Sequence, residues 1–380
     1  MMGRSSDMQE ERLAWLHLAR AVGVGPVRHR RLVEQFGSAR QALVALREAT
    51  KRRETLIHGK IVIPARREIE EEWFRVHDMG GSILTLLDDA YPPQLALINQ
   101  APLVLTVLGR KELLQRQMVG VVGSRHPSLN SSMFIEKLAR ALAEHGFVVV
   151  SGMAHGIDSA AHKGALSGGT VAVLACGVDV VYPPENERLY RQLSDVGALL
   201  SEEALGAPPH AKLFPKRNRI IAGLSLGLVV MDAKARSGSL ITADYALSYH
   251  REIFAVPGSP QDPRSYGANF LIQQGAVLVS TVDDILRHIT ARQERMEQSK
   301  DVRFLHQECD HPVATPLPSG KALVDMRRSI LSLLDAVPLA MDIVIEKSAC
   351  PPSHVAYILL ELDLEGRLEY HQGNKVSLVM

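Results

Sequence analysis

The chain has 380 residues, of which 46% are hydrophobic and 22% are charged, and its formal net charge at pH 7 is +1. This length and composition predict an ordinary globular protein of two or three domains with a large core. Because the net charge is close to zero, a strong global field is excluded, and any site for an anion must come from local groups of cations.

Cysteine usage and hydropathy exclude two further classes of protein. The three cysteines are odd in number, far apart and without a C-x-x-C pair, which argues against a disulfide framework and favours a reducing compartment. The polar N-terminus MMGRSSDMQEERLAW lacks the apolar core of a signal peptide. No apolar run reaches the roughly 18 residues that a membrane span requires. The sequence therefore predicts a cytoplasmic protein with no membrane segment.

The N-terminal part is predicted to be a small helical domain, over residues 1–80. Leu, Ile and Val recur at three-to-four spacing over residues 10–80, which is typical of amphipathic helices. The stretch GVGP at 23–26 interrupts two of these helices and is followed by three arginines, Arg28, Arg30 and Arg31. It resembles a helix–hairpin–helix, whose hairpin N–H groups can bind a DNA phosphate. A purely structural or protein-docking domain is the alternative, since any turn between helices favours glycine.

The central region, residues 81–292, is predicted to be an α/β domain. Residues 81–115 are extended and contain prolines, and we interpret them as a connector with one strand, Leu103–Leu108. Beyond them, apolar runs alternate with helical patterns, which is typical of a doubly wound, mostly parallel sheet of the extended Rossmann-like kind. The candidate strands are Met118–Val122, Phe147–Val150, Val171–Ala175, Ala198–Ser201, Leu226–Met231, Ile253–Val256 and Ala276–Val279.

The C-terminal part is predicted to be a winged-helix module over residues 321–380, after a polar, proline-containing linker at 293–320. Three helices and a short hairpin support this interpretation; they lie near Met326–Leu334, Met341–Lys347, Pro352–Glu365, Arg367–Tyr370 and Val376–Val379. Many winged helices bind DNA. Because acidic residues outnumber basic ones here, a protein contact or an auxiliary role is favoured.

Glycine-containing loops follow the first two strands of the parallel region. GSR at 123–125 ends the first strand, and SGMAHGID at 151–158 ends the second. On neighbouring parallel strands such loops open at the same edge of the sheet, where backbone N–H groups and helix N-termini collect negatively charged ligands. We therefore predict phosphate contacts from Gly123, Ser124, Arg125, Gly152 and Gly156.

Two later segments add cations to the same predicted rim. KRNR at 216–219 stands between the fourth and fifth strands, in a loop at a predicted helix start, and KARSGS at 234–239 follows the fifth strand. Three cations within four residues will not all be buried. We include Lys216, Arg217, Asn218, Arg219, Lys234 and Arg236 in the predicted rim. The residues alone leave open whether the phosphate belongs to a nucleotide cofactor or to a nucleic acid.

No catalytic residue, cofactor or metal site is predicted. The chain lacks both the G-x-G-x-x-G dinucleotide fingerprint and the G-x-x-x-x-G-K-[ST] loop. Ser151, Asp158 and His162 suggest a hydrolase triad, but without a G-x-S-x-G elbow a structural Asp–His pair is favoured. Structural zinc usually takes four ligands. The predicted linker offers only three closely spaced ones, His306, Cys309 and His311.

Several motifs together resemble the DNA-processing protein A family, also called DprA or Smf. They are GSR at 123–125, SGMAHGIDSAAHKGAL at 151–166, GGTVAVLACGVDVVYPPEN at 168–186, LFPKRNRIIAGLS at 213–225, ARSGSLITADYAL at 235–247, FAVPGSP at 254–260 and GANFLIQQGA at 267–276. The resemblance implies a cytoplasmic homodimer that binds single-stranded DNA, protects DNA taken up in natural transformation and loads the RecA recombinase onto it. It implies neither a cofactor nor catalysis. It also implies that Arg125, Lys216, Arg217 and Arg219 contact the DNA.

The main alternative is an enzyme of the related nucleoside-monophosphate phosphoribohydrolase family. Those proteins carry a P-G-G-x-G-T-x-x-E loop, whereas this chain has RSGSLITAD at 236–244, without the PGG and without the glutamate. A NAD-dependent dehydrogenase is disfavoured by the absent glycine fingerprint, and an adaptor with merely solvated basic loops is a further alternative.

Overall fold

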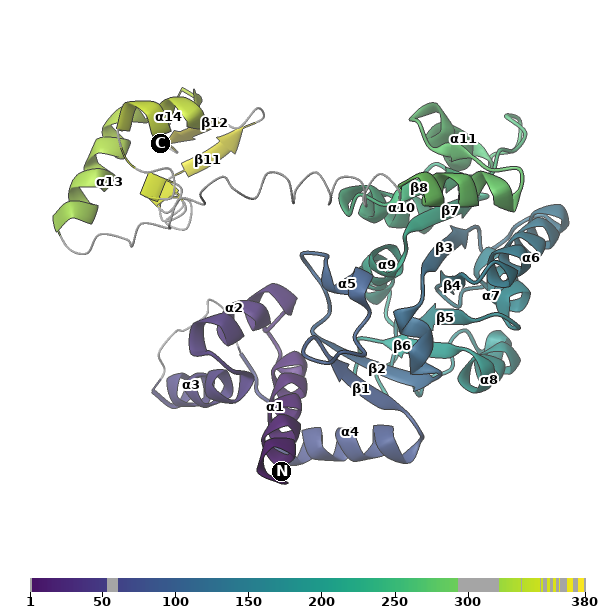
Figure 1. Ribbon diagram of the computed structural model, residues 1–380, viewed down its shortest axis with the longest axis horizontal. Helices are drawn as coiled ribbons and strands as arrows, with labels where there is room; N and C mark the ends of the chain where they lie inside the picture. The colour runs from purple at the N-terminus through teal and green to yellow at the C-terminus, as the bar shows by residue number, and fades with distance from the viewer. Residues whose placement is uncertain are drawn as a thin grey trace. The chain divides into compact units, whose positions relative to one another are not determined.

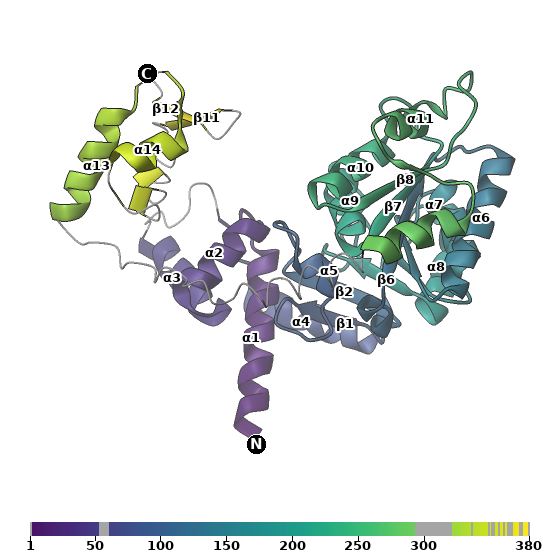
Figure 2. The same cartoon turned by 45° about the horizontal axis from the view of Figure 1, so that its top comes forward.

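The computed structural model describes residues 2–52, 61–292, 321–335, 337–348, 350, 354–355, 358–359, 362, 368–371 and 375–378. The chain divides into two compact units, Met1–Arg295 and Met296–Met380. Figures 1 and 2 show the elements of each unit from two directions. The predicted linker at 293–320 lies outside the described residues.

The first unit begins with a group of helices, as the hydrophobic spacing predicts. They are α1 Met2–Arg20, α2 Pro26–Phe36, α3 Ala39–Arg52 and α4 Arg66–Asp78. The turn before α2 needs Gly23, whose φ of 87° lies in the left-handed region. Proline then occupies the first position of α2, where a missing N–H costs nothing. Leu16, Leu18 and Leu46 are buried between these helices.

A nine-stranded sheet forms the centre of this unit, in the order β1-β2-β6-β5-β4-β3-β7-β8-β9. The seven strands from β6 to β9 in this order run parallel, while β2 pairs antiparallel with both β6 and β1. The strands are β1 Ser82–Thr85, β2 Val104–Gly109, β3 Met118–Gly123, β4 Val148–Ser151, β5 Thr170–Val173, β6 Ala198–Ser201, β7 Gly227–Met231, β8 Glu252–Ala255 and β9 Val277–Leu278. The predicted doubly wound, mostly parallel architecture is confirmed.

Helices cover both faces of the sheet, and the described apolar side chains of sheet and helices build three core clusters, two of which include residues of β3. The remaining helices of the unit are α5 Pro93–Ala96, α6 Leu129–Glu144, α7 Ile157–Ala165, α8 Glu187–Val196, α9 Leu213–Leu224, α10 Gly238–Ser248, α11 Tyr266–Gln273 and a helix over 282–292, with 3-10 turns at Lys111–Gln115 and Pro184–Asn186. Alternate residues of β3 enter the two clusters: Met118 and Val122 join α9, whereas Val119 and Val121 join α6. Such burial on both faces explains the continuous apolar runs.

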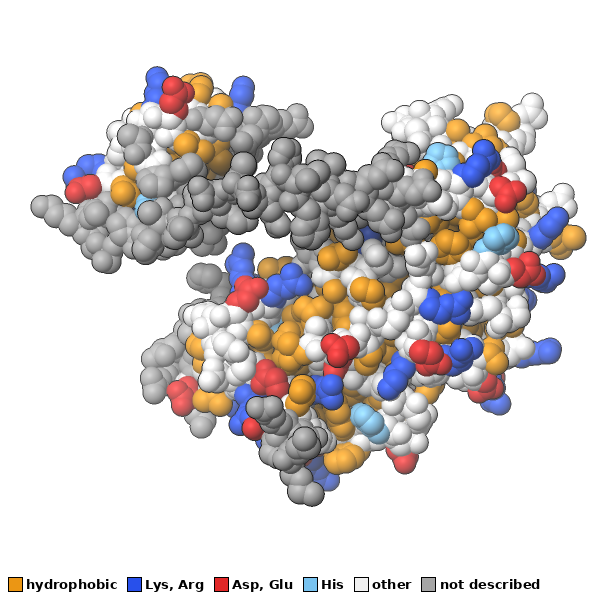
Figure 3. All heavy atoms as spheres, viewed as in Figure 1, with side chains coloured by type: hydrophobic (Ala, Val, Ile, Leu, Met, Phe, Trp, Pro, Cys, Tyr) orange, Lys and Arg blue, Asp and Glu red, His pale blue; other side chains and the backbone are white. Residues whose placement is uncertain are grey.

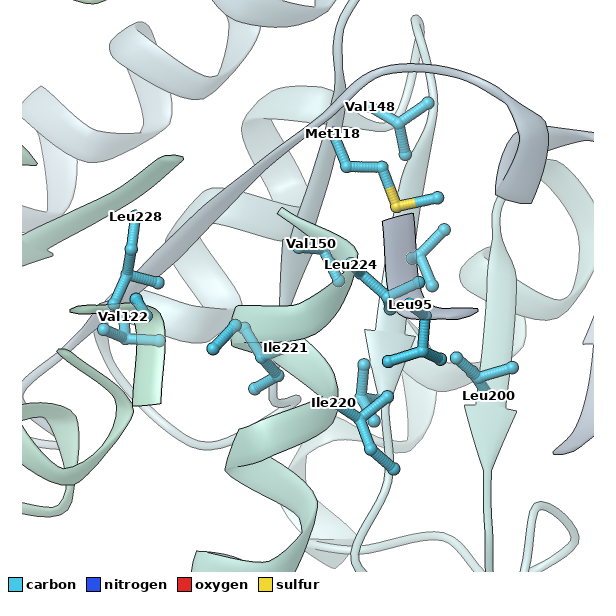
Figure 4. Packing of buried hydrophobic residues seen from close by; sticks show 14 of the residues in the cluster. Leu95, Met118, Val122, Val148, Val150, Leu200, Ile220, Ile221, Leu224 and Leu228 are labelled. Carbon is cyan, nitrogen blue, oxygen red and sulfur yellow. The ribbon is translucent and has the colours of Figure 1, made fainter. Parts of the chain in front are cut away.

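Figure 4 shows how α9 lies on one face of the sheet. Ile220, Ile221 and Leu224 project from its second half toward the strands, where they meet Leu228 of β7 and Leu95 of α5. All five side chains are buried. The second half of α9 is therefore fixed by apolar packing, which at about 25 cal/mol per Å² is the main favourable term in such contacts.

Two local predictions are wrong in the first unit. The strand expected at Leu103–Leu108 is present as β2, but the rest of 81–115 is more than a connector, because β1 pairs antiparallel with β2 and extends the sheet by one further strand. The run KRNR at 216–219 was expected in a loop at the start of a helix. It lies inside α9, which begins one turn earlier, at Leu213. That shift gives its four side chains different directions.

The second unit contains α13 Lys321–Leu333, β10 Leu339–Ala340, α14 Met341–Ser348, β11 Leu368–His371 and β12 Lys375–Leu378. Its three strands pair in the order β10-β12-β11, so the predicted hairpin gains a third, short strand that the sequence reading missed. Most of the third predicted helix, Pro352–Glu365, falls outside the described residues. Among the residues described in both units, no helix has the length and apolarity needed to cross a membrane.

Candidate functional site

The strand order places a crevice between β3 and β7. From β3 the chain moves outward through β4, β5 and β6, whereas β7, β8 and β9 continue in the opposite direction. At such a topological switch point the loops after the two central strands diverge, and ligands of doubly wound sheets bind there. A cavity of about 350 Å³ occupies this place, lined by the loops that follow β3 and β7 and by the first turns of α9 and α10.

The loop after β3 supplies one exposed cation. Gly123 ends the strand where no side chain fits, since a Cβ atom there would lie 2.1 Å from the carbonyl oxygen of Met231. The Ser124 hydroxyl accepts a hydrogen bond from the backbone N–H of His126. The exposed Arg125 guanidinium lies over the Phe214 ring, 5.5 Å from its centroid. This cation–π contact orients Arg125 beside the cavity without neutralising its charge.

The loop after β7 supplies two more exposed cations, Lys234 and Arg236. Neither forms an ion pair with any residue in the described part of the chain. The loop leads directly into α10, where Ser237 occupies the N-cap position but its side chain does not cap the helix. The first N–H groups of α10 are thus available to an anion, in a position that the helix dipole favours. This wall of the cavity presents positive charge to solvent.

The wall formed by α9 is different, because its side chains are engaged. Phe214 and Asn218 line the cavity, and the Asn218 side-chain amide donates to the carbonyl oxygen of Gly238, at 3.3 Å. Arg217 is only 7% exposed and donates to the carbonyl oxygens of Gly152 and Val173. Arg217 also lines the cavity, so this wall presents polar side chains that already have partners inside the protein.

Lys216 and Arg219 lie on another side of α9 and bind carboxylates. Arg219 is 3% exposed and lies 2.6 Å from Glu202, while the exposed Lys216 contacts both Glu202 and Glu203. Burial alone would lower the pKa of Lys216, but the two carboxylates outweigh that effect and raise it. Both cations line a second hollow of about 580 Å³, shared with the turn before α2 and with Arg28. The structure therefore does not bring them together with Arg125.

Gly152 and Gly156 are explained by close packing inside the protein. A Cβ atom on Gly152 would lie 2.6 Å from the nearer guanidinium nitrogen of Arg217. Gly156 has a φ of 76°, and a Cβ atom there would lie 2.4 Å from the carbonyl oxygen of Ser124. Gly152 therefore lets α9 approach the loop after β4, and Gly156 lets the loops after β3 and β4 approach each other.

The hydrolase triad that Ser151, Asp158 and His162 suggested is not present in the structure. The Ser151 hydroxyl donates to the carbonyl oxygen of Val121, and His162 Nδ1 bonds the Thr170 hydroxyl. Burial lowers the pKa of His162 to about 3, so the ring is neutral at physiological pH. Asp158 accepts a hydrogen bond from the backbone N–H of Ala154. Each side chain thus has a structural partner outside the triad.

Sequence reasoning missed one aromatic residue and one acidic residue of the site. Tyr182 lies beside Phe214, with ring centroids 5.7 Å apart, and both border a second cavity of about 220 Å³ next to the first. Asp232 lines the first cavity with a φ of 50°, which is rare for a residue with a side chain. Tyr182 was quoted only within a motif, and no sequence signal marks the backbone conformation of Asp232.

Figure 3 shows acidic and basic side chains intermingled on the face of the first unit that it displays. This distribution agrees with a net charge near zero. Within the described ranges, no group of three or more His, Cys, Asp or Glu side chains could hold a metal ion. His306, Cys309 and His311 lie outside those ranges.

Comparison with protein families gives three matches along the chain. Residues 82–290 match the family described as DNA recombination-mediator protein A, residues 9–74 match a DprA-like N-terminal HHH domain, and residues 314–374 match a DprA winged helix domain. The first match covers more than half of the chain. The three matches follow one another in the order of the helical, α/β and winged-helix parts.

Curated proteins of this family are similar in sequence to this chain over long stretches. Protein Smf of Synechocystis is 33% identical over 389 aligned positions, which cover 96% of this chain and 98% of that protein. DNA processing protein DprA of Streptococcus pneumoniae is 46% identical and covers 57% of this chain and 79% of its own length. Protein Smf of Escherichia coli is 35% identical, and the alignment covers 82% of both chains.

Two solved structures are similar at the level of the fold and the sequence. The crystal structure of DNA processing protein A from S. pneumoniae has a TM-score of 0.54 and 36% identity, covering 70% of this chain and 98% of that one. The structure of DNA processing protein A from Helicobacter pylori has a TM-score of 0.52 and 28% identity, covering 56% and 96%. The latter structure was described for its single-stranded DNA binding mode.

Proposed function

The chain belongs to the DNA recombination-mediator protein A family, and from this premise we propose that it binds single-stranded DNA in the crevice between β3 and β7. The observation that carries the proposal is the wall formed by the loops after β3 and β7. It presents three exposed cations, Arg125, Lys234 and Arg236, beside the uncapped start of α10. Cations and backbone N–H groups contact phosphates without reading the base sequence, so binding is expected to tolerate any sequence and to weaken with salt.

Single strands are favoured over duplex by the shape and the lining of the site. The cavity of about 350 Å³ adjoins the cavity of about 220 Å³ that Phe214 and Tyr182 border. A base can stack on an aromatic side chain only when the face of the base itself is free. Such stacking contributes about 1–3 kcal/mol per base. A stiff duplex keeps its bases stacked on one another and cannot place them in these hollows.

The proposed contacts fall into two groups. Arg125, Lys234 and Arg236 bind phosphates together with Ser124 and Asn218, while Gly123, Gly152 and Gly156 keep the loops close enough to form the site. Lys216 and Arg219 would meet the DNA strand only where it leaves the crevice across α9, toward the hollow of about 580 Å³ beside the turn before α2.

We propose that the wider role is the one the family resemblance implies. The protein protects single-stranded DNA during natural transformation, loads RecA onto it, acts in the cytoplasm and needs neither a cofactor nor a catalytic residue. A homodimer is supported by large apolar side chains that are exposed on α11 and on the edge strand β9: Tyr266 by 57% and Phe270 by 44% on α11, and Leu278 by 46% on β9. Exposed edge strands and apolar patches commonly mark surfaces that associate.

The test is fluorescence anisotropy of a labelled dT oligomer against a matched duplex over a salt series. We expect tight, steeply salt-dependent binding of the single strand and at least tenfold weaker binding of the duplex. A RecA-loading assay and light scattering at micromolar concentration then test the recombinase and the dimer. Equal binding of both DNAs, or of neither, contradicts the proposal. In the second case, binding of small phosphorylated ligands would favour the phosphoribohydrolase-like alternative.

A further inference from the structure

We propose that Arg217 is a positioning residue that holds the first half of α9 in place and does not itself bind phosphate. From the sequence, Arg217 was predicted to be one of the phosphate contacts of the rim. The inference rests on the proposed function, because the consequence of misplacing α9 is a loss of single-stranded DNA binding.

Arg217 lines both cavities at the crevice, but two of its three guanidinium nitrogens donate to groups inside the protein. Its Nη1 atom donates to the carbonyl oxygen of Gly152, at 2.6 Å, and also to that of Val173. Its Nε atom donates to the side-chain oxygen of Asn218, at 3.2 Å. Gly152 directly follows β4 and Val173 is the last residue of β5. One side chain therefore joins α9 to the ends of two neighbouring strands.

Apolar packing does not provide this anchorage for the first half of α9. The buried residues of the helix begin at Arg217, and the apolar ones begin at Ile220. Figure 4 shows the apolar anchors of the second half directed toward the sheet. Phe214 and Asn218, which line the cavity, belong to the first half, where neither is fully buried. Their placement depends on the polar contacts of this part of the helix.

The surroundings of Arg217 are built to receive its guanidinium. Gly152 leaves the space that the guanidinium fills, since a Cβ atom there would come within 2.6 Å of Nη2. Asp158 is also buried and interacts electrostatically with Arg217, which opposes the effect that burial has on the pKa of each group. The carbonyl oxygens of Gly152 and Val173 and the side-chain oxygen of Asn218 hold the guanidinium in one orientation, which is the role of an architectural arginine.

Arg217 also begins a chain of contacts that crosses the crevice. Asn218 accepts from Arg217 and donates to the carbonyl oxygen of Gly238, the first residue of α10. Phe214, one turn before Asn218, carries the Arg125 guanidinium over its ring. A shift of Arg217 would therefore displace the groups on both sides of the cavity.

The experiment compares Arg217→Lys and Arg217→Met with Arg125→Ala in the full-length chain. It measures the affinity for a labelled dT oligomer over a salt series and the thermal unfolding of each variant. Lysine keeps the charge but cannot reach two carbonyl oxygens with a planar fork. We expect Arg217→Lys to bind about tenfold more weakly and both Arg217 variants to keep the wild-type salt slope. Loss of a direct phosphate contact in Arg217→Met would instead reduce the slope by about 0.7.

A double-mutant cycle with Phe214→Ala separates positioning from general destabilisation. If Arg217 acts through α9, the loss caused by Arg217→Lys shrinks at least threefold in the Phe214→Ala background, because the group it positions is gone. Full additivity, a reduced salt slope for Arg217→Met, or wild-type affinity of Arg217→Lys would each overturn the inference.

Two further measurements keep the outcome decisive. If Arg217→Met does not fold, Gly152→Ala is tested in its place. The added methyl group displaces the Arg217 guanidinium without removing its charge. Weaker binding with an unchanged salt slope is again expected. Failure of the proposed function has a different signature, in which wild type does not bind the dT oligomer or Arg125→Ala binds as wild type does. Weakened Arg125→Ala together with wild-type behaviour of Arg217→Lys refutes only the role of Arg217.

Discussion

The loops at the crevice and the helix α9 each carry three cations, but the two regions use them differently. On the wall of the loops after β3 and β7, Arg125, Lys234 and Arg236 are exposed and lack carboxylate partners among the described residues. On α9, Arg217 at the crevice and Arg219 on another side of the helix are both buried. The α9 cations bind carbonyl oxygens or carboxylates of the protein itself.

What a cation can bind depends on its partner more than on its position in a basic run. A cation with a solvated charge attracts a phosphate at little cost, whereas a paired cation must first give up its carboxylate. The densest basic run of the site, KRNR at 216–219, therefore contributes mainly to architecture, and the more dispersed cations of the other wall contribute to binding.

The largest effect is expected for Arg125→Ala. Removing a charged group that donates directly to phosphate costs about 1.5–3 kcal/mol, which corresponds to a loss of affinity of more than tenfold. Thermal stability should not change, because the side chain is exposed. Anisotropy with a dT oligomer checks the affinity. Arg140→Ala, on α6 and outside the cavity lining, is the control with the same change of charge. Equal affinities of the two variants would contradict the comparison.

The next largest effects are expected for Lys234→Ala and Arg236→Ala, each a loss of a few-fold. Each variant should also lower the slope of log affinity against log salt by about 0.7, the value for one phosphate contact with a single strand. The double variant should show the sum of both changes, since two independent exposed cations act additively. An unchanged slope in the double variant would place the strand elsewhere.

A smaller effect is expected for Lys216→Ala, in the same direction and below about threefold. Lys216 lies 2.9 Å from Glu203 and 3.3 Å from Glu202, so its charge is largely compensated before DNA arrives. Glu203→Gln, which frees part of this charge, should strengthen binding slightly. If Lys216→Ala weakened binding as strongly as Arg125→Ala does, the paired cations of α9 would contribute as much as the unpaired cations of the loops, which contradicts the distinction between them.

The smallest effect near neutral pH concerns two buried histidines, His162 in α7 and His29 in α2. Burial lowers the pKa of His162 to about 3 and that of His29 to about 4. Below pH 6.5 the unfolded chain therefore binds protons that the folded chain refuses, and the free energy of unfolding should fall between pH 6.5 and pH 4. Denaturant unfolding at several pH values measures this, and His29→Gln should flatten the dependence. Stability that rises toward pH 4 would contradict the assignment.

Much of the central sheet was predictable because its strands are buried on both faces and leave continuous apolar runs, as in β3 and β7. The loop GSR at 123–125 was predictable for the same reason, since it follows such a run directly. The edge strand β1 was not recognised, because it has four residues and its partner β2 lies about 20 residues further on.

The pairing of the α9 cations could not be predicted from local sequence. Arg217 meets Gly152, which is 65 positions away, and Val173, which is 44 away. Lys216 meets Glu203 across 13 positions and a change of element. A run of cations shows its composition in the sequence, but the groups that neutralise it are brought together only by the fold.

The most direct test of the central claim is a map of where the single strand lies. A dT oligomer containing 5-bromodeoxyuridine can be photo-crosslinked to the wild-type protein, and the attached peptides identified by mass spectrometry. The crevice between β3 and β7 predicts crosslinks in the peptides that carry Phe214 and Tyr182, and their loss in Arg125→Ala. Crosslinks confined to the second unit, or unchanged by Arg125→Ala, would contradict it.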